Sequence, residues 1–318
     1  MERIGVVVIG SGLIARFHAQ AIGASSRLEL KGFCNPRSLA HAKAAADAFG
    51  GEAWDDLDAA LASPGVGMAT VATASGGHDE AVFAAARHKV PILVEKPLSI
   101  TVARIDAMIA ACRESGTPLG CIFQSRWSED YENARAKIAS GELGKLTYAG
   151  IRIPWWREDD YYVRSSWHGT WEVDGGGALM NQSIHMVDWL VSLMPDVEDV
   201  KAFAATLAHP METEDTVSAA IRFKGGALGG VYAATSSFPG RGKTREITGT
   251  KGTLEIRDDA HGTSRPDQLE FAGHLKCFEA FADSLEGGAP YPIPGEEARK
   301  SVDLIERIYR DAHVIAEP

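Results

Sequence analysis

The fold of this protein is decided near its N-terminus, where the chain reads Ile4-Gly5-Val6-Val7-Val8-Ile9-Gly10-Ser11-Gly12-Leu13-Ile14-Ala15. The apolar run that ends at Ile9 is typical of a strand buried on both faces of a parallel sheet. Glycines then allow a tight turn, and Leu13, Phe17 and Ala21 follow at helical spacing. This stretch therefore predicts a strand, a glycine-rich turn and a helix in direct succession.

The same alternation of strands and helices continues to about residue 123. Further strands are expected at Leu28–Cys34, Met68–Ala72, Ile92–Glu95 and Leu119–Phe123, and helices at Leu39–Phe49, His78–His88 and around Ile105–Cys112. Strands that alternate with helices form βαβ units, whose right-handed crossovers connect parallel strands. Residues 1–123 are thus predicted to form a Rossmann domain, an α/β domain with a doubly wound parallel sheet.

The pattern changes in the second part of the chain. A helix near Asp130–Ile138 precedes a strand at Lys145–Ile153 and a loop that is rich in aromatic residues. Consecutive strands are then expected at Val200–Leu207, Thr216–Phe223, Ala227–Ala234, Arg245–Gly249 and Thr253–Ile256, followed by helices at Gln268–Leu285 and Glu296–Val314. Residues 124–318 are therefore predicted to form a second α/β domain with an open, mostly antiparallel sheet, and the last helices are candidates for packing on the first domain.

Composition excludes several classes of protein. The 318 residues include 32 Lys and Arg against 43 Asp and Glu, which gives a formal net charge of −11 and argues against binding to nucleic acid or to an anionic membrane. No apolar stretch approaches the ~18 residues of a membrane span. The four cysteines lack metal-like spacing and are expected to be buried thiols. We expect a cytoplasmic protein.

The glycine-rich turn carries the first functional signal. In Gly10-x-Gly12-x-x-Ala15, the first glycine permits the turn and the second lets the backbone approach a pyrophosphate. The backbone at Leu13 and Ile14 opens the following helix, whose positive end favours an anion. The motif predicts a dinucleotide cofactor, NAD or NADP.

The end of the second strand normally selects between these two cofactors. An acidic residue there binds the ribose hydroxyls and repels a 2′-phosphate. Here Asn35 takes the acidic position, and Arg37 with Ser38 could bind a phosphate. The alternative is that Arg37 is a solvated residue at a helix start. The residues favour NADP slightly and leave NAD open.

Two further segments carry candidate catalytic residues. Glu95-Lys96-Pro97 lies at the carboxyl end of a parallel strand, where doubly wound sheets bind ligands, and a cis bond before Pro97 would aim Lys96 at a bound ligand. If the segment 175–188 (GGGALMNQSIHMVD) is helical, Asn181, His185, Asp188 and Ser192 share one stripe. His185 would then serve as a general acid or base and Asn181 would orient a substrate hydroxyl. The alternative is a structural hydrogen bond between His185 and Asp188.

Taken together, the glycine motif, the Glu95-Lys96-Pro97 triplet and the segment 175–188 resemble the Gfo/Idh/MocA oxidoreductases, relatives of glucose–fructose oxidoreductase and inositol dehydrogenase. The resemblance extends over nearly the whole chain. It implies a Rossmann domain, a second domain whose open sheet often forms the oligomer interface, and hence a homodimer or homotetramer. It also implies that Lys96 and His185 are the catalytic pair.

The chain departs from the family pattern at two places. Many family dehydrogenases have Asp four residues before the His, where this chain has Asn181, so the full Lys-Asp-His arrangement is absent from the sequence. The usual T-P-N-x-x-H stretch reads Thr73-Ala74-Ser75-Gly76-Gly77-His78 here. The expected cofactor contacts outside the glycine turn and the second strand are Thr73, Ser75, His78, Glu95, Lys96 and Gln124.

The aromatic loop before the His-bearing segment is the candidate substrate wall. Aromatic faces suit a pyranose or cyclitol ring, and polar groups satisfy its hydroxyls. The residues expected to bind the substrate are Trp155, Trp156, Arg157, Tyr161, Trp167 and Trp171, together with Asn181 and His185. The alternative for any single Trp is that it anchors the loop or an oligomer contact.

The predicted activity is reversible oxidation of a secondary alcohol on a sugar, sugar derivative or cyclitol, with hydride transfer to the nicotinamide and removal of the hydroxyl proton by Lys96 or by His185. Which of the two accepts the proton is open. No metal is expected. Two other hypotheses are a redox-assisted glycosidase that retains its cofactor and a non-catalytic sensor of NAD or NADP.

Overall fold

A computed structural model describes residues 3–164, 167–258 and 271–315. The chain divides into two compact units. Unit 1 comprises Met1–Ser99, Ala103–Gln124 and Leu269–Arg299, and unit 2 comprises Ile100–Val102, Ser125–Gln268 and Lys300–Pro318. Each unit has its own six-stranded sheet.

The sheet of unit 1 is parallel throughout and has the order β3-β2-β1-β4-β5-β6. Its strands are β1 (Ile4–Ile9), β2 (Leu28–Cys34), β3 (Glu52–Trp54), β4 (Val66–Val71), β5 (Ile92–Val94) and β6 (Leu119–Cys121). The strand order reverses between β1 and β4, which creates the crevice at the carboxyl ends where such sheets bind ligands. Val6, Val7 and Val8 are fully buried, so β1 is covered on both faces as its apolar run predicts.

The connections of unit 1 are mostly helical. They are α1 (Leu13–Ala24), α2 (Leu39–Phe49), α3 (Leu57–Leu61), the short 3₁₀ turn η1 (Ser75–Gly77), α4 (His78–His88) and α5 (Val102–Ser115), the last of which begins in unit 2. Helix α9 (Ala272–Leu285) returns to unit 1 from late in the chain and packs against α1. Arg27 on the α1 side binds Asp283 and Glu286 at the end of α9.

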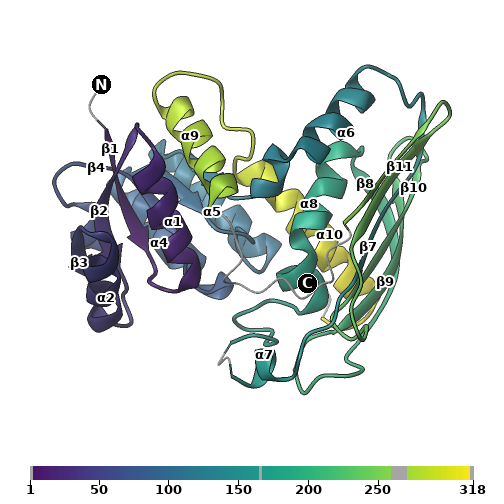
Figure 1. Ribbon diagram of the computed structural model, residues 1–318, viewed down its shortest axis with the longest axis horizontal. Coiled ribbons are helices and arrows are strands. Elements are labelled where there is room, and N and C mark those ends of the chain that lie inside the picture. The colour runs from purple at the N-terminus through teal and green to yellow at the C-terminus, as the bar shows by residue number, and fades with distance from the viewer. Residues whose placement is uncertain (1–2, 165–166, 259–270, 316–318) are drawn as a thin grey trace. The chain divides into compact units, whose positions relative to one another are not determined.

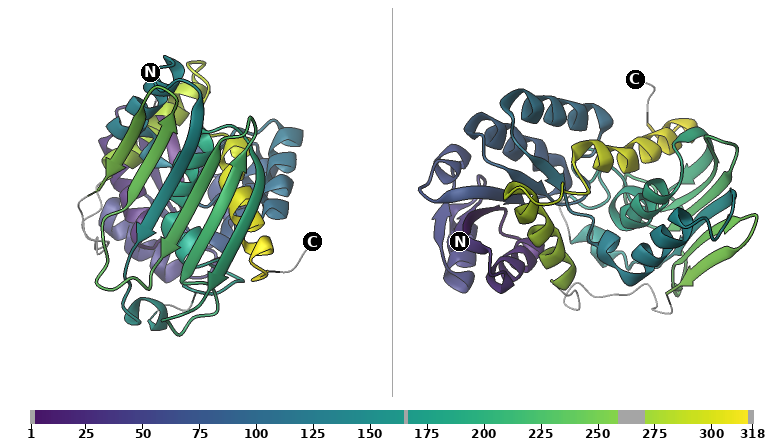
Figure 2. Two further views of the ribbon diagram at one scale, coloured as in Figure 1. Left: turned by 90° about the vertical axis from the view of Figure 1, so that its right-hand side faces the viewer. Right: turned by 90° about the horizontal axis from the view of Figure 1, so that it is seen from above.

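The sheet of unit 2 is mixed and mostly antiparallel, with the order β12-β11-β7-β10-β9-β8 (Figure 2, left). Its strands are β7 (Leu146–Pro154), β8 (Val197–Ala205), β9 (Thr216–Phe223), β10 (Leu228–Ala234), β11 (Thr244–Gly249) and β12 (Thr253–Arg257). Only β7 and β10 pair in parallel. Burial alternates along β9, as expected when one face of a sheet is covered and the other is solvated.

Unit 2 also contains helices and short helical turns. They are the 3₁₀ turn η2 (Gln124–Trp127), whose first residue belongs to unit 1, α6 (Glu129–Ala139), α7 (Asp160–Val163), the π-helical turn η3 (Ala178–Gln182), α8 (Ser183–Leu193) and α10 (Gly295–Asp311), which begins in unit 1. Helix α8 packs on β7, and α6 packs on α8. Helices α6, α8 and α10 lie along one face of the second sheet (Figure 1).

Most predicted elements are present, and the differences have local causes. Elements β3, α3 and α7 are not predicted from the sequence, because with three, five and four residues they are too short to show a periodic pattern. The expected helix Gln268–Leu285 begins among residues 259–270, which lie outside the described residues, and its described part is α9. Among the described residues, no helix combines the length and the apolar character needed to cross a bilayer.

Candidate active site

The glycine turn of unit 1 fits a dinucleotide phosphate. Gly10 has a φ of +115°, and a Cβ there would lie 2.5 Å from the Ala72 carbonyl oxygen, so backbone and packing both require glycine. Gly12 has an ordinary φ of −77°, and a Cβ there would meet nothing within 4 Å. Open space thus lies in front of the first turn of α1, which has no side-chain cap. Free N–H groups and this space suit a pyrophosphate.

The end of β2 is joined to the glycine turn by Asn35. Its Nδ2 donates to Ser11 Oγ over 2.7 Å, and its Oδ1 accepts from the Arg37 backbone N–H over 3.0 Å. Ser38 is the N-cap of α2, where its hydroxyl accepts from the His41 N–H. Asn35 and Ser38 therefore have structural partners in the turn.

A shallow pocket of about 360 Å³ opens beside the end of β2 and includes Pro36 and Leu57. Its acidic lining residues are Asp55, Asp56, Asp58 and Glu80. Arg87 also lines the pocket and pairs with Asp58 over 2.9 Å. The region next to the expected ribose site is therefore acidic overall, a feature that the second strand alone does not reveal.

His78 connects two loops at the carboxyl edge of the sheet. Its Nδ1 lies 2.9 Å from the Pro97 carbonyl oxygen, and its Nε2 lies 3.2 Å from the Thr73 carbonyl oxygen. Burial lowers the pKa of His78, although both carbonyl contacts act in the opposite direction. Ser75 is buried in the turn η1 between these loops. His78 therefore holds the segment after β4 against the segment after Lys96.

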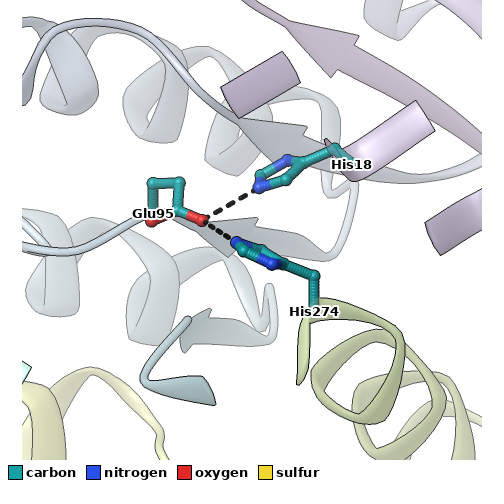
Figure 3. Close-up of side chains that lie close together, drawn as sticks. All are labelled: His18, Glu95 and His274. Atoms are coloured by element: carbon teal, nitrogen blue, oxygen red, sulfur yellow. Dashed lines mark hydrogen bonds and ion pairs between the residues drawn. The ribbon is translucent and has the colours of Figure 1, made fainter. Parts of the chain in front are cut away.

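Lys96 follows β5 and precedes a cis peptide bond to Pro97. Its backbone N–H donates to Glu95 Oε2 over 3.0 Å. The other oxygen of this carboxylate, Oε1, lies 3.0 Å from the Nε2 atoms of both His18 and His274 (Figure 3). The peptide that carries Lys96 is thus tied to a buried polar cluster.

The carboxyl group of Glu95 is buried, so little solvent reaches it to stabilise its charge. Burial by itself raises the pKa of Glu95, but hydrogen bonds with His18 and His274 outweigh burial and hold the pKa well below its usual range. One potential ligand atom from each of the three side chains lies within 4.8 Å of the other two, so the group could hold a metal ion. Hydrogen bonds account for the observed distances without one.

Gln124, at the end of unit 1, offers an unused polar atom. Its Oε1 is buried and has no hydrogen-bond partner among the described residues. Such an atom fits a site completed by a ligand. Arg126, two residues later in unit 2, is buried instead in a two-bond ion pair with Asp188, at 2.8 and 2.6 Å. It has a structural partner.

The helix that carries His185 differs from the prediction. Asn181 lies in the π-helical turn η3, His185 lies in the α-helix α8, and Asp188 is fully buried. The expectation of one polar stripe along a single α-helix is therefore wrong. The π turn changes the angular spacing of the side chains around the helix axis. Asp188 is buried because it forms an ion pair with Arg126.

A buried glutamate fixes the start of this helical segment. Glu214 Oε2 accepts from Gly177 N–H over 2.9 Å, and Oε1 accepts from Leu179 N–H and from the Tyr309 hydroxyl over 2.8 Å each. Burial raises the pKa of Glu214 to about 7, and these hydrogen bonds only partly offset it. The backbone N–H groups that begin η3 are thereby satisfied.

A polar chain runs through the side chains before and within η3. Both Nε and Nη2 of Arg157 donate to Gln182 Oε1, at 3.0 and 2.8 Å. Gln182 Nε2 donates to the Tyr161 hydroxyl over 2.8 Å and to Asn181 Oδ1 over 2.7 Å. Asn181 in turn donates to Asp174. Asn181 is therefore oriented by an acid and an amide.

The aromatic residues of the loop divide into two groups. The Arg157 guanidinium lies 5.1 Å from the Trp155 ring and 5.7 Å from the Tyr161 ring, and burial lowers its pKa. Trp167 packs on His168, 4.0 Å between ring centroids, and His168 stacks on Tyr161.

The other two Trp side chains have packing partners elsewhere. Trp156 packs between His209 and Phe238, and Trp171 contacts the Tyr309 ring edge-on. The structure thus brings Trp155, Arg157 and Tyr161 together and places Trp156 and Trp171 on other neighbours.

Both parts of the chain match known protein families. Residues 4–123 match an oxidoreductase family with an NAD-binding Rossmann fold, and residues 131–255 match the GFO/IDH/MocA C-terminal domain. This chain belongs to the Gfo/Idh/MocA family. The resemblance inferred from the sequence is confirmed, and the protein is an NAD-binding oxidoreductase of the dehydrogenase type.

Individual relatives of this Gfo/Idh/MocA protein are dehydrogenases. The WlbA dehydrogenase from Bordetella pertussis, in complex with NADH and UDP-GlcNAcA, is 31% identical with a TM-score of 0.90, over 98% of this chain and 97% of its own. Myo-inositol 2-dehydrogenase from Thermotoga maritima is 26% identical over 95% of this chain and 93% of its own. D-glucoside 3-dehydrogenase from Escherichia coli is 28% identical, over 96% and 95% respectively.

Several residues of the site region are not predicted from the sequence. His18 and His274 lie 77 and 179 residues from Glu95, so no local pattern links them. Glu214 lies 35 residues beyond Leu179, in a strand-rich segment. Gln182 stands inside the quoted segment 175–188, and its amide beside Asn181 was the one available signal.

Proposed function

We propose that this protein oxidises a secondary alcohol of a sugar, a sugar derivative or a cyclitol, and reduces the corresponding ketone in reverse. The observation that carries the proposal is the position of Lys96 just after β5, at the carboxyl edge of the NAD-binding sheet, where Glu95 binds its backbone N–H. The sugar and cyclitol dehydrogenases among its relatives support this substrate class.

When bound, the nicotinamide supplies a hydride acceptor or donor. The chain supplies the rest of the chemistry. We propose Lys96 and His185 as the catalytic pair, one removing the hydroxyl proton and the other binding the alcohol oxygen. Asn181, which Asp174 and Gln182 orient, would accept or donate a hydrogen bond to a substrate hydroxyl. We propose the glycine turn, Thr73, Ser75, His78 and Gln124 as the surroundings of the cofactor.

For the substrate we propose contacts from the group around Arg157. The guanidinium between Trp155 and Tyr161 combines a positive charge with two apolar faces, which suits a sugar ring carrying an anionic group. The UDP-linked ligand of the WlbA dehydrogenase is an example of such a sugar. We propose that Trp156, Trp167 and Trp171, in the same loop, also belong to the substrate wall.

For the cofactor we propose NAD(H), against the slight preference for NADP that the second strand indicates. Arg37 could bind a 2′-phosphate, but the acidic pocket next to Pro36 would repel it. The NADH complex of the WlbA dehydrogenase supports this choice.

The cysteines bear on the location of the protein in the cell. All four are free and buried, which is compatible with the cytoplasmic location that we propose.

The second sheet exposes large apolar side chains. Among them are Phe203 on β8 and Leu228 on β10. We propose that this sheet forms a homodimer or homotetramer interface.

Steady-state kinetics with sugars, cyclitols and UDP-linked sugars test the function. We expect NADH formation with at least one substrate, and Lys96→Met should lower kcat more than about 1,000-fold while NADH affinity stays within about tenfold (~1.4 kcal/mol). Full activity of Lys96→Met would contradict the proposed mechanism. Turnover without net NADH would indicate a redox-assisted glycosidase, and cofactor binding without any turnover would indicate a sensor.

A further inference from the structure

Three side chains of unit 1 form a buried cluster that the proposed chemistry does not use directly. His18 comes from α1, Glu95 follows β5 and His274 comes from α9 (Figure 3). All three are at most 6% exposed. A cluster of titratable groups in the core, directly before the proposed catalytic lysine, needs a physical account.

The hydrogen bonds around the cluster indicate where its protons lie. The Thr70 hydroxyl donates its single proton to the Leu93 carbonyl oxygen over 2.8 Å. Thr70 Oγ1 must then accept from His18 Nδ1, 3.1 Å away. The other ring nitrogen of His18, Nε2, faces Glu95 Oε1 at 3.0 Å. With a neutral imidazole and an ionised carboxylate, two lone pairs would oppose each other there, so one additional proton lies between these atoms.

The second histidine determines how many protons the cluster holds. His274 Nδ1 is buried and has no partner among the described residues, so its ring proton belongs on Nε2, which donates to Glu95 Oε1. The cluster then carries one imidazole-bound positive charge, or its proton on the carboxyl group, and is neutral as a whole. Neutrality avoids the free-energy cost of an uncompensated buried carboxylate.

We propose that His18, Glu95 and His274 share this proton as one unit and that the unit positions Lys96. The inference rests on the proposed catalytic role of Lys96. His18 and His274 are positioning residues, because they hold Glu95 Oε1 while Oε2 binds the Lys96 N–H. A carboxylate fixed at both oxygens fixes the peptide from which the lysine extends.

Burial lowers the pKa of His18, and the hydrogen bond with Glu95 acts in the opposite direction, so the shared proton depends on the contact between these two side chains. The groups that face the cluster are Thr70 on β4, His78 on α4 and Cys277 on α9. Burial raises the pKa of the Cys277 thiol well above its usual value, so it stays neutral. Loss of the shared proton would leave a net negative charge in the core.

Nitrogen-15 NMR of the histidine side chains in the unmodified protein tests the shared proton. We expect His18 to carry a proton on Nδ1 and a low-field proton between Nε2 and Glu95, unchanged from pH 6 to 9, with His274 protonated on Nε2. His18→Asn assigns the signals. A His18 ring with a bare Nδ1, or a stoichiometric metal ion in the purified protein that His18→Asn releases, would overturn the proposal.

A matched pair of variants tests the positioning role. His274→Leu removes the donor to Glu95 and should lower kcat about 100-fold with the KM for NAD nearly unchanged, as expected for a displaced catalytic group. His274→Gln keeps an N–H near the position of Nε2 and should recover most of the rate and the pH profile. Lys276→Ala, exposed on the same helix, is the control.

Equal rates in His274→Leu and His274→Gln, with both variants folded by circular dichroism, would refute the positioning role. Absence of dehydrogenase activity in the unmodified protein would instead refute the proposed function, and with it the positioning of a catalytic lysine. The NMR result decides the shared proton in either case.

Discussion

The two units each bury a glutamate that binds backbone N–H groups of a segment proposed for the site, but the two carboxyl groups behave oppositely. Glu95 in unit 1 is surrounded by two imidazoles, and its pKa lies well below the usual range. Glu214 in unit 2 is held by backbone N–H groups and a tyrosine hydroxyl, and burial raises its pKa to about 7. Both bind backbone N–H groups, that of Lys96 and those that begin η3.

The difference teaches that titratable partners decide the charge of a buried carboxyl. Histidines can supply a compensating proton, so Glu95 is stabilised as part of a neutral pair. Backbone amides and a hydroxyl supply only dipoles, so desolvation dominates at Glu214. The same residue type therefore anchors one loop through charged partners and the other through hydrogen bonds from backbone N–H groups and a hydroxyl.

The largest stability effect is expected from Glu95→Gln. The amide lacks the charge that the hydrogen bonds with His18 and His274 stabilise, so the free energy of unfolding at pH 7 should fall by about 3 kcal/mol. The carboxylate's contribution is present above the unfolded pKa of Glu and is lost as pH falls through the lower folded pKa. Urea unfolding at pH 7 and at pH 4 measures both, and an equal loss at the two pH values would contradict the account.

Glu214→Gln should reverse the pH trend. The raised pKa means that Glu214 stabilises the fold relative to its ionised form below pH ~4.5, and that this contribution is lost as pH rises toward about 7. The stability of the unmodified protein relative to Glu214→Gln should therefore decrease by about 3 kcal/mol between pH 4 and pH 8, from 1.36 kcal/mol per pKa unit. A difference independent of pH would show that Glu214 has an ordinary pKa.

Arg157→Lys separates the two units by function. Lysine keeps the charge but cannot donate two parallel hydrogen bonds to Gln182 or stack as a planar group. We expect the KM of the substrate to rise about tenfold while the dissociation constant of NADH changes less than twofold. Steady-state kinetics and NADH fluorescence measure the two constants. Weakened NADH binding would place Arg157 with the cofactor instead.

The smallest effect is expected in the acidic pocket of unit 1. Asp55→Asn removes one exposed negative charge near the end of β2 and should tighten NADPH binding about twofold, consistent with the small energies of exposed charges. NADH binding should not change. Arg37→Ala should shift NADPH affinity in the opposite direction by a similar factor. No response of NADPH to either variant would place the ribose away from both side chains.

Local patterns were sufficient for much of the fold. The bounds of Leu28–Cys34, Leu39–Phe49 and Thr216–Phe223 agree with the structure because continuous or periodic apolar residues define them. The three-residue strand β3 has no such pattern. The π turn η3 was missed because its hydrogen bonds depend on Glu214, which is distant in sequence.

The order of strands and helices, the glycine turn for a dinucleotide and the Lys96 and His185 motifs all follow from neighbouring residues, because periodicity and short-range turn chemistry are local. The partners of those motifs do not. His18, Glu95 and His274 come together only when α9 packs on α1. Asp188, expected on a polar stripe, is buried in an ion pair with Arg126 instead. Side-chain charge and proton positions depend on burial and on contacts between distant segments, and these exist only once the chain has folded.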